Sequence, residues 1–243
     1  MQDSLVIIPT YNEIENIELI IDAVLAVNDL VHILVVDDSS PDGTAARVKQ
    51  IQFKEPDRLF LLSRNHKNGL GTAYIAGFKW ALEKKYQFVF EMDADFSHNP
   101  DDLPLLYSVF NDNNVSMVVG SRYVRGVNVV NWPMSRVLLS YGASKYVRFI
   151  TGMDIHDTTA GFVGYRSSLL CKLNLERIKF VGYAFQIEMK FKTYLLKEKI
   201  VEIPVVFTDR SRGVSKMSSG IIKEAVFGVL SMKIKSLLGT LQI

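Results

Sequence analysis

Short apolar runs alternate with segments of helical periodicity along the first half of the chain. A short, wholly apolar run is typical of a strand buried on both faces of a sheet. Strands that alternate with helices of ten to fifteen residues predict βαβ units. We therefore predict an α/β fold with a mostly parallel central sheet and helices on both of its faces. The predicted strands are 5–8, 32–36, 59–62, 88–90 and 117–120, and the predicted helices include 72–84 and 101–110.

Two further helices are predicted in this half from spacing and from a capping signal. Apolar residues recur at helical spacing from Ile14 to Leu25, directly after Asn12-Glu13. Ser40 followed by Pro41 predicts the start of the next helix, because serine caps helices and proline fits the first turn.

The second half of the chain is less regular. Helices are expected over 134–150 and 185–196, and a strand over 200–207. No linker rich in Pro, Gly or Ser is visible, so we predict one domain over 1–220 with an apolar helical extension over 221–243. One face of this extension carries no charge and either lies in a membrane interface or packs on the protein's own core. The residues of that face are Ile221, Ile222, Ala225, Val229 and Met232.

Polar residues gather where the predicted strands end. In parallel α/β sheets, ligands bind outside the carboxyl ends of the strands. Four such clusters on one edge predict a nucleotide-type site. They are Tyr11-Asn12-Glu13, Asp37-Asp38, Asp93 with Asp95, and Ser121-Arg122.

The carboxylate pair Asp93-Ala94-Asp95 is the first candidate for chemistry. Magnesium is usually held by one or two carboxylates together with phosphate oxygens. The ordinary alternative for an isolated Asp-x-Asp is a solvated loop. Asp37-Asp38 on the same edge favours a bound ligand, because crowded acids repel one another unless a partner satisfies them. His98 is either a further metal ligand or an ordinary loop histidine.

Glycines and basic residues supply the other candidates. Gly69-Leu70-Gly71 resembles a dinucleotide fingerprint only in part, since Tyr74 replaces its third glycine, and we do not expect NAD. Arg122, Arg136 and the basic loop 210–216 are candidates for binding phosphate groups. The ordinary alternative for each of these cations is a solvated surface charge.

Composition narrows the class of protein. Hydrophobic residues make up 48% and charged residues 22% of the 243 residues, which are globular values. The net charge of 28 − 26 = +2 gives no reason to expect nucleic-acid binding. The single cysteine, Cys171, excludes an internal disulfide and suggests a reducing compartment. We see neither a signal peptide nor an uncharged apolar window of about 18 residues, so a soluble or peripherally bound intracellular protein is expected.

A series of motifs resembles one known family. The chain is similar to the dolichyl- or polyprenyl-phosphate mannose synthases, which are inverting transferases of GT-A fold in glycosyltransferase family two. The resemblance covers about residues 4 to 220. The motifs, in order, are LVIIPTYNE, LVVDDSSPDGT, NGLGTAYIAGF, MDADFSHNP, GSRY, NWPMSR, AGF and RSRGVSK.

This resemblance implies a role for individual residues. The donor would be bound by Pro9, Tyr11, Glu13, Val36, Asp38, Asp93, Ala94, Asp95, Arg122, Arg210 and Lys216. Asp93 and Asp95 would hold Mg²⁺ or Mn²⁺, and the acceptor phosphate would meet Arg122, Arg136 and Ser140. Asp95, Arg122 and Arg136 are expected to matter most for catalysis. Many relatives have a glutamine metal ligand where this chain has Ser97, so either the serine or a water would take its place.

The implied activity is transfer of mannose from GDP-mannose to a polyprenyl phosphate, with inversion, at the cytoplasmic face of a membrane to which the protein is peripherally bound. Two alternatives remain: the same chemistry with UDP-glucose or a UDP-aminosugar, or a non-catalytic nucleotide-binding regulatory partner. A phosphate acceptor is largely ionised at pH 7, so no catalytic base is expected. Asp157 is the nearby acid that could still serve as one.

Overall fold

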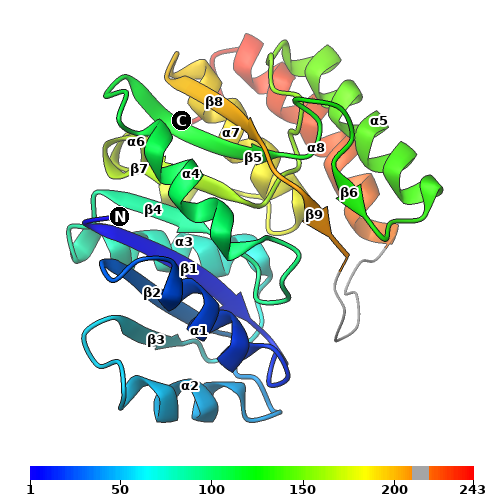
Figure 1. Cartoon of the computed structure of the whole chain (residues 1–243). Helices are drawn as coiled ribbons and strands as arrows, with labels where there is room; N and C mark the ends of the chain where they lie inside the picture. Colours follow the sequence, from blue (N-terminus) through cyan, green and yellow to red (C-terminus); the bar gives the residue numbers. More distant parts are fainter. Residues whose placement is uncertain (210–218) are drawn as a thin grey trace.

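A seven-stranded sheet forms the centre of the molecule (Figure 1). The computed structural model describes residues 1–209 and 219–243, with the backbone alone for residues 183 and 219–225. The strand order is β3-β2-β1-β4-β7-β5-β8, and only β7 runs antiparallel to its neighbours. The strands are β1 (Ser4–Thr10), β2 (Val31–Asp37), β3 (Leu59–Ser63), β4 (Phe88–Glu91), β5 (Val115–Ser121), β7 (Val163–Arg166) and β8 (Lys199–Pro204). A separate pair joins β6 (Val129–Val130) to β9 (Phe207–Thr208).

Helices cover both faces of this sheet, which confirms the predicted fold class. Alternate residues of β1 point to opposite faces, as the strand period of two requires. Val6 and Ile8 pack in the cluster that includes α1, α2 and α4, whereas Leu5 and Ile7 pack in the cluster that includes α3, α6 and α7. The helices are α1 (Ile17–Val27), α2 (Thr44–Gln52), α3 (Leu70–Glu83), α4 (Leu103–Val109), α5 (Met134–Thr151), α6 (Ser167–Lys172), α7 (Tyr183–Leu195) and α8 (Ser219–Leu237), with short 3₁₀ turns η1 (Pro100–Asp102) and η2 (Leu175–Arg177).

Strand β7 was not predicted from the sequence. It is only four residues long, and Gly164 interrupts its apolar pattern. A Cβ atom at this glycine would lie 2.6 Å from Cε1 of Phe90 on the neighbouring strand, so close packing inside the sheet requires the glycine. Because Gly164 has no side chain, it fits against Phe90 in the sheet. The same lack of a side chain interrupts the apolar pattern from which the strand could have been predicted.

Two local predictions were wrong. Ser40 does not cap a helix, because α2 begins at Thr44 after Gly43, which has a φ of 91°. The Ser40 hydroxyl instead donates to Asp37 Oδ1 at 2.6 Å and accepts from the backbone N–H of Asn12 at 3.0 Å. The strand expected over 200–207 is two strands, since β8 ends at Pro204 and β9 begins at Phe207.

Helix α8 forms most of the predicted C-terminal extension. Val229 and Met232 are buried in a cluster with Val147 of α5 and Phe191 of α7. This part of its charge-free face therefore packs on the protein's own core, while Ile221, Ile222 and Ala225 lie where side chains are not described. The domain boundary at residue 220 stays a prediction. None of the described helices is both long enough and apolar enough to cross a membrane.

Candidate active site

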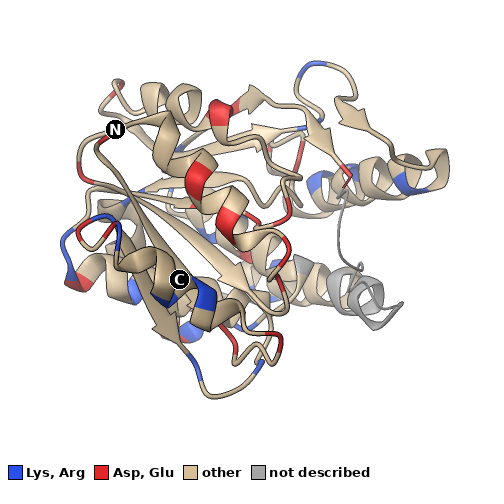
Figure 2. Cartoon of the chain, turned by 60° about the horizontal axis from the view of Figure 1, so that its bottom comes forward, with Lys and Arg blue, Asp and Glu red and all other residues tan. Residues whose placement is uncertain are grey.

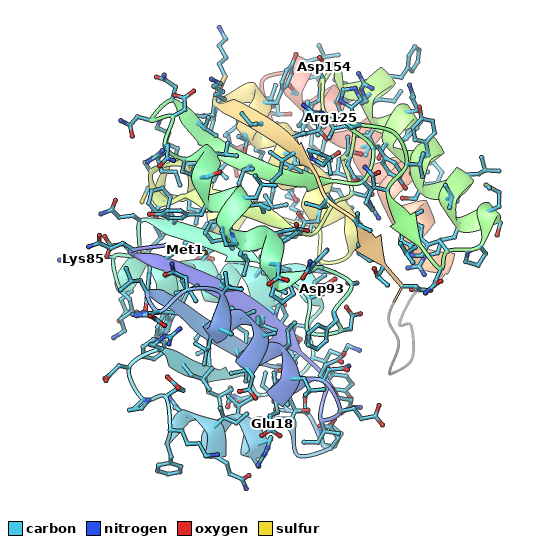
Figure 3. All side chains as sticks on the ribbon, in the orientation of Figure 1. Met1, Glu18, Lys85, Asp93, Arg125 and Asp154 are labelled. Carbon is cyan, nitrogen blue, oxygen red and sulfur yellow. The ribbon has the colours of Figure 1, made fainter. Side chains whose placement is uncertain are left out.

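The polar clusters predicted at the strand ends do share one edge of the sheet. Strands β1, β2, β4 and β5 run in the same direction, so the residues that follow them emerge together. Thr10 at the end of β1 donates to Asp37 Oδ1 at the end of β2, with a distance of 2.9 Å. Figure 3 shows Asp93 near the middle of the molecule, between the β1–β3 half and the half that contains α5.

The ends of β1 and β2 form the first part of the site. Asp38 pairs with Arg64, whose Nε lies 2.7 Å from Oδ1. Burial raises the pKa of Asp38, and the guanidinium only partly opposes this shift. The Tyr11 ring lies under the Lys67 ammonium, 4.2 Å from Nζ to the ring centroid. These groups offer ring and carboxylate contacts of the kind that a nucleoside needs.

The other residues predicted for the nucleotide differ in what they can contribute. The backbone N–H of Glu13 donates to Thr44 Oγ1 at 3.0 Å, and its carboxylate accepts from Asn16 at 3.0 Å. Pro9 is a partly exposed residue of β1. Val36 is fully buried in the core, so only its backbone could meet a ligand.

The carboxylate pair follows β4. Asp93 is half-buried and Asp95 is buried, while Ala94 between them packs into the core. Asp95 Oδ1 accepts from the backbone N–H of Ser97 at 3.1 Å. These contacts fix the turn that carries both carboxylates.

His98 supports this turn from inside. Its Nδ1 accepts from the backbone N–H of Asp93 at 3.2 Å, and its ring stacks on Phe162 with centroids 4.9 Å apart. Burial lowers the pKa of His98 to about 4, so the ring is neutral at pH 7. The structure therefore favours the loop-histidine interpretation over a metal ligand.

The residues at this turn fit a divalent cation that is shared with a phosphate. No group of three or more His, Cys, Asp or Glu that could hold a metal by itself occurs among the described residues. Two carboxylates need phosphate oxygens or water to complete the octahedron of Mg²⁺. Ser97 Oγ is buried and has no hydrogen-bond partner in the described part of the chain, which leaves one more oxygen on the same turn.

Arg122, at the end of β5, is held by Asp157. Its Nε donates to Asp157 Oδ2 and its NH2 to Oδ1, both at 2.7 Å, and its backbone N–H also donates to Oδ2 at 2.9 Å. Burial would raise the pKa of Asp157, but Arg122 outweighs burial and lowers it. Both carboxylate oxygens accept from Arg122 and the side chain is fully buried. Asp157 therefore orients the Arg122 side chain, and this arginine occupies both of its carboxylate oxygens.

The turn that carries Asp157 is fixed from two neighbouring elements. Glu202 of β8 accepts from the backbone N–H groups of His156 and Asp157, at 2.7 and 2.9 Å. Lys190 of α7 is fully buried and donates to the carbonyl of Ala160 at 2.8 Å. A strand and a helix thus hold the 156–160 segment at both ends, and through it Arg122.

Arg136, in the first turn of α5, has partners that the sequence does not suggest. Its NH1 donates to Asp209 Oδ1 at 2.8 Å, and its guanidinium lies 4.1 Å from the centroid of the Trp132 ring. The indole N–H of Trp132 is buried and finds no acceptor within the described residues. Asp209 and the Trp132 ring thereby fix the direction of the Arg136 side chain. The indole N–H of Trp132 is a further hydrogen-bond donor beside it.

One cavity of about 460 Å³ connects these groups. Its polar wall includes Asp93, Asp95, Arg122, Arg136 and Ser140. Its apolar wall is formed by Leu138, Leu139, Tyr146, Ile187 and Val226, which come from α5, α7 and α8. The arrangement can hold a phosphorylated ligand beside a diphosphate, with a hydrocarbon group against the helices.

The structure thus brings together the predicted residues at the ends of β4 and β5 and on α5. Pro9, Tyr11, Glu13, Val36 and Asp38 are not part of the cavity wall, although they lie on the same sheet edge. Arg210 and Lys216 lie outside the described residues. The sequence analysis missed Trp132, Asp209 and Glu202, and the motif NWPMSR was the one available signal for the first of these.

Comparison with known proteins identifies the family. The α/β fold is that of the GT-A glycosyltransferases, and the chain is a glycosyltransferase. It belongs to glycosyl transferase family 2, whose sequence profile matches residues 5–173.

Two curated relatives are similar over most of the chain. The polyprenol monophosphomannose synthase of Mycolicibacterium smegmatis is 46% identical over 234 residues, which are 96% of this chain and 88% of the relative. The undecaprenyl-phosphate mannosyltransferase of Micrococcus luteus is 44% identical over 225 residues, covering 93% and 91%. The resemblance to polyprenyl-phosphate mannose synthases predicted from the motifs is confirmed.

Solved structures confirm the fold. Glucosyl-3-phosphoglycerate synthase from Mycobacterium tuberculosis, in complex with Mn²⁺, UDP-glucose and phosphoglyceric acid, has a TM-score of 0.70 at 17% identity, over 98% of this chain and 80% of that one. The same enzyme with Mg²⁺ and UDP has a TM-score of 0.65 at 18% identity, over 98% and 80%. These neighbours bind a divalent metal together with a nucleoside diphosphate.

Proposed function

We propose that this glycosyltransferase transfers mannose from GDP-mannose to the phosphate of a polyprenyl phosphate, with inversion at the anomeric carbon. The observation that carries the proposal is one cavity with two unlike walls, one polar and one apolar. Carboxylates and arginines line one wall, as a diphosphate and an acceptor phosphate require. Apolar side chains of three helices line the other, as a lipid chain requires. The names of the two curated relatives support the same acceptor class.

The donor would lie along the strand ends. Tyr11, Glu13 and Asp38 would meet the nucleoside, and Asp93 and Asp95 would hold Mg²⁺ or Mn²⁺ on the diphosphate. The cation, when bound, offsets the negative charge that grows on the departing diphosphate. We assign Arg210 and Lys216 to the same diphosphate from their place in the family motif.

The acceptor needs alignment rather than deprotonation. A phosphate monoester has a second pKa of about 6, so it is largely dianionic at pH 7. An acceptor oxygen attacks the anomeric carbon while the bond from that carbon to the diphosphate breaks, and the diphosphate leaves with the electron pair. Arg122, Arg136 and Ser140 would hold the acceptor opposite the leaving group and reduce the repulsion between two anions. The unused indole N–H of Trp132 adds a donor on the same side.

We place the reaction at the cytoplasmic surface of a membrane, with the protein bound peripherally. A polyprenyl chain stays in the bilayer, so the cavity has to reach the lipid headgroup from outside. The apolar wall formed by α5 and α8 supports this arrangement, because it gives the hydrocarbon a path away from the polar wall.

A panel of nucleotide sugars tests the donor. The thermal unfolding midpoint is measured with Mn²⁺ and GDP-mannose, UDP-glucose or a UDP-aminosugar, since a ligand stabilises the state that it binds. Selective stabilisation by GDP-mannose, followed by transfer of labelled mannose to a polyprenyl phosphate, is the expected result. Selective stabilisation by a UDP-sugar would show that this sugar nucleotide, and not GDP-mannose, is the donor. No change in the unfolding midpoint with any nucleotide would favour the alternative of a non-catalytic regulatory partner.

A further inference from the structure

Tyr74 of α3 carries a buried hydroxyl group that has no hydrogen-bond partner among the described residues. The side chain is fully buried and lines the cavity, and its ring stacks on that of Phe185 of α7 with centroids 6.0 Å apart. Ser97 and Trp132 also bring a buried polar atom of this kind to the cavity. Because a buried hydroxyl left unpaired destabilises a protein, its place on the cavity wall indicates that a bound ligand supplies the partner.

Helices α3 and α7 meet at the end of the cavity where Tyr74 lies. A Cβ atom at Gly71 would lie 2.8 Å from the Phe185 ring, so the glycine allows the two helices to approach closely. The backbone N–H of Gly71 also donates to the carbonyl of Val181 at 2.9 Å. Each helix places on the cavity two residues that are four positions apart, and we call these residues the α3–α7 end of the cavity. They are Leu70 and Tyr74 of α3, with Gly182 and Gln186 at the start of α7.

Gln186 is held in a fixed orientation at this end. Its Nε2 donates to the carboxylate of Glu91 of β4, and its Oε1 accepts from Nζ of Lys190 at 3.3 Å. All three side chains are buried. The amide nitrogen carries two hydrogens, of which the contact with Glu91 uses one. The other hydrogen is available to a ligand in the cavity.

The α3–α7 end contains no cation, which distinguishes it from the rest of the cavity. Arg122 and Arg136 line the cavity from β5 and α5, and Figure 2 shows Lys and Arg but no Asp or Glu along α5. At Tyr74, burial raises the pKa of the hydroxyl well above its usual value, and the negative charge of Asp93 raises this pKa further. A hydroxyl and an amide beside carboxylates suit the neutral hydroxyl groups of a ligand, whereas carboxylates repel a phosphate group.

The reaction itself places a sugar in this part of the cavity. The proposed function assigns the donor diphosphate to Asp93 and Asp95 after β4, and the acceptor phosphate to Arg122 after β5. Only β7 lies between these two strands in the sheet. The group that lies between the two phosphates during transfer is the sugar, because its anomeric carbon exchanges one phosphate oxygen for the other.

We propose that the α3–α7 end of the cavity binds the hexose of the nucleotide sugar, and that the Tyr74 hydroxyl forms a hydrogen bond with one sugar hydroxyl group and so contributes to the choice of sugar. A site that pairs a substrate hydroxyl discriminates against a sugar without it, because the buried group of the protein is then left unpaired. This inference rests on the proposed nucleotide-sugar donor.

Tyr74→Phe tests the proposal, because it removes one oxygen atom and keeps the ring that stacks on Phe185. Calorimetry of the full chain with Mn²⁺ should show that the variant binds GDP-mannose about tenfold more weakly than wild type, as expected for one hydrogen bond. GDP, which has no sugar on its diphosphate, should bind both proteins equally. Equal weakening for GDP and GDP-mannose, or unchanged binding of both, would overturn the proposal.

Tyr165→Phe is the matched control. Tyr165 is also fully buried, but its hydroxyl donates to Glu91 at 3.0 Å and does not line the cavity. This control should lower the free energy of unfolding and leave the ratio of the GDP-mannose and GDP affinities unchanged. Tyr74→Phe should not lower the free energy of unfolding, since its hydroxyl has no partner in the described part of the protein. A loss as large as that of Tyr165→Phe would show that Tyr74 serves the fold, and would overturn the proposal.

Deoxy analogues of GDP-mannose identify the sugar hydroxyl. Removal of the hydroxyl that meets Tyr74 should weaken binding to wild type, and should cause little further loss in Tyr74→Phe, because the variant already lacks the partner. Losses that add for every analogue would show that there is no direct contact.

The same measurements separate a wrong donor from a wrong sugar site. If neither GDP nor GDP-mannose bound to wild type, the proposed donor would be wrong, and UDP and UDP-glucose would replace them in the comparison. A loss in Tyr74→Phe that is confined to UDP-glucose would then support the sugar site while contradicting the donor. Absence of binding by any of these nucleotides would overturn both.

Discussion

Charged side chains in the active site take partners from distant segments of the chain. Asp157 lies 35 positions after Arg122, and Asp209 lies 73 positions after Arg136. Each carboxylate fixes the direction of an arginine that would otherwise move freely through several rotamers. Fixing it in advance avoids part of the ordering cost when a phosphate binds.

Substituting Asp95 tests the carboxylate pair. Asp95→Asn should lower kcat/KM on the order of 100-fold, about 3 kcal/mol, because a transition-state charge interaction is lost while the shape of the side chain stays. The unfolding midpoint should stay close to that of wild type. Asp101→Asn, on the exposed turn η1, is the matched control. Near-wild-type turnover in Asp95→Asn, with a chelator control, would contradict the metal assignment.

Asp157→Asn distinguishes a positioning residue from a base. An amide cannot accept both hydrogen bonds from the Arg122 guanidinium, and loss of one partner of a buried pair destabilises a protein by about 3 kcal/mol or more. Turnover should fall by a similar factor at every pH between 6.5 and 8.5, measured below the unfolding temperature. Recovery of turnover as the pH rises, with donor binding intact, would instead show that the reaction needs a base.

His98 makes stability depend on acid pH. Its pKa is lowered to about 4 in the folded state, from the ordinary histidine value of about 6.5. The unfolded chain therefore binds this proton first, so the contribution is full above pH 6.5 and is lost as the pH falls toward 4, by about 3 kcal/mol in total. His98→Asn can still accept from the N–H of Asp93 and should flatten this part of the curve. Denaturant unfolding at pH 7 and pH 5 gives the free energy of unfolding of wild type and of His98→Asn. If this free energy changed equally between the two pH values in both proteins, the prediction would be refuted.

At the scale of elements, contacts between helices determine which helix faces are buried in most of the second half of the chain. Helix α8 has one buried and one exposed apolar face, so neither its sequence nor its length alone says which face meets the core. Its contacts with α5 and α7 determine that the face with Val229 and Met232 meets the core. The core alternative considered for the C-terminal segment is therefore supported for Val229 and Met232. On the outer face, Phe227 and Ile234 are exposed.

A pair of substitutions on α8 separates its two faces. Met232→Ala should lower the free energy of unfolding by about 2–4 kcal/mol, because it leaves a cavity beside Phe191 and Val147. Phe227→Ala removes a larger side chain from the exposed face, and its effect should stay within about 0.5 kcal/mol. Chemical denaturation measures both values. A larger loss for Phe227→Ala than for Met232→Ala would show that the described packing is incorrect.

At the scale of the whole molecule, charge is unevenly distributed along the sequence. The segments that form α5 and α8 carry a net +5 and the rest of the chain carries −3, which together give the total of +2. Such a field acts over about 10 Å at 0.1 M salt and over about 3 Å at 1 M. The overall net charge of +2 therefore conceals this uneven distribution.

Vesicle binding should accordingly depend on salt. Raising NaCl from 0.05 to 0.5 M should weaken binding to phosphatidylglycerol vesicles at least tenfold, because the attraction of each basic residue is screened. The remaining binding, from exposed apolar side chains of α5 and α8 such as Phe149 and Phe227, should persist on both anionic and neutral vesicles. Binding that does not change with salt would show that the cations take no part.

The fold class could be predicted from the sequence because its signals are local. Apolar runs such as 5–8 and 117–120 are short, bury both faces and end in polar residues, and each of these properties belongs to neighbouring positions. Asp93 and Asp95 were found for the same reason, since a pair on one turn is visible without knowing the fold. Strand β7 was missed because Gly164 breaks its pattern, and only the packing against Phe90 explains that glycine.

What the tertiary structure alone decided is which charges pair and which apolar faces stay exposed. Arg122 and Arg136 are visible in the sequence as candidate phosphate ligands. Asp157, Glu202 and Asp209 become their supports only once β8 pairs with β5 and β9 pairs with β6. The outer face of α8 is likewise exposed only because α5 and α7 occupy its inner face. Periodicity determines that a helix has an apolar face, whereas the free energy of packing between distant segments determines what that face meets.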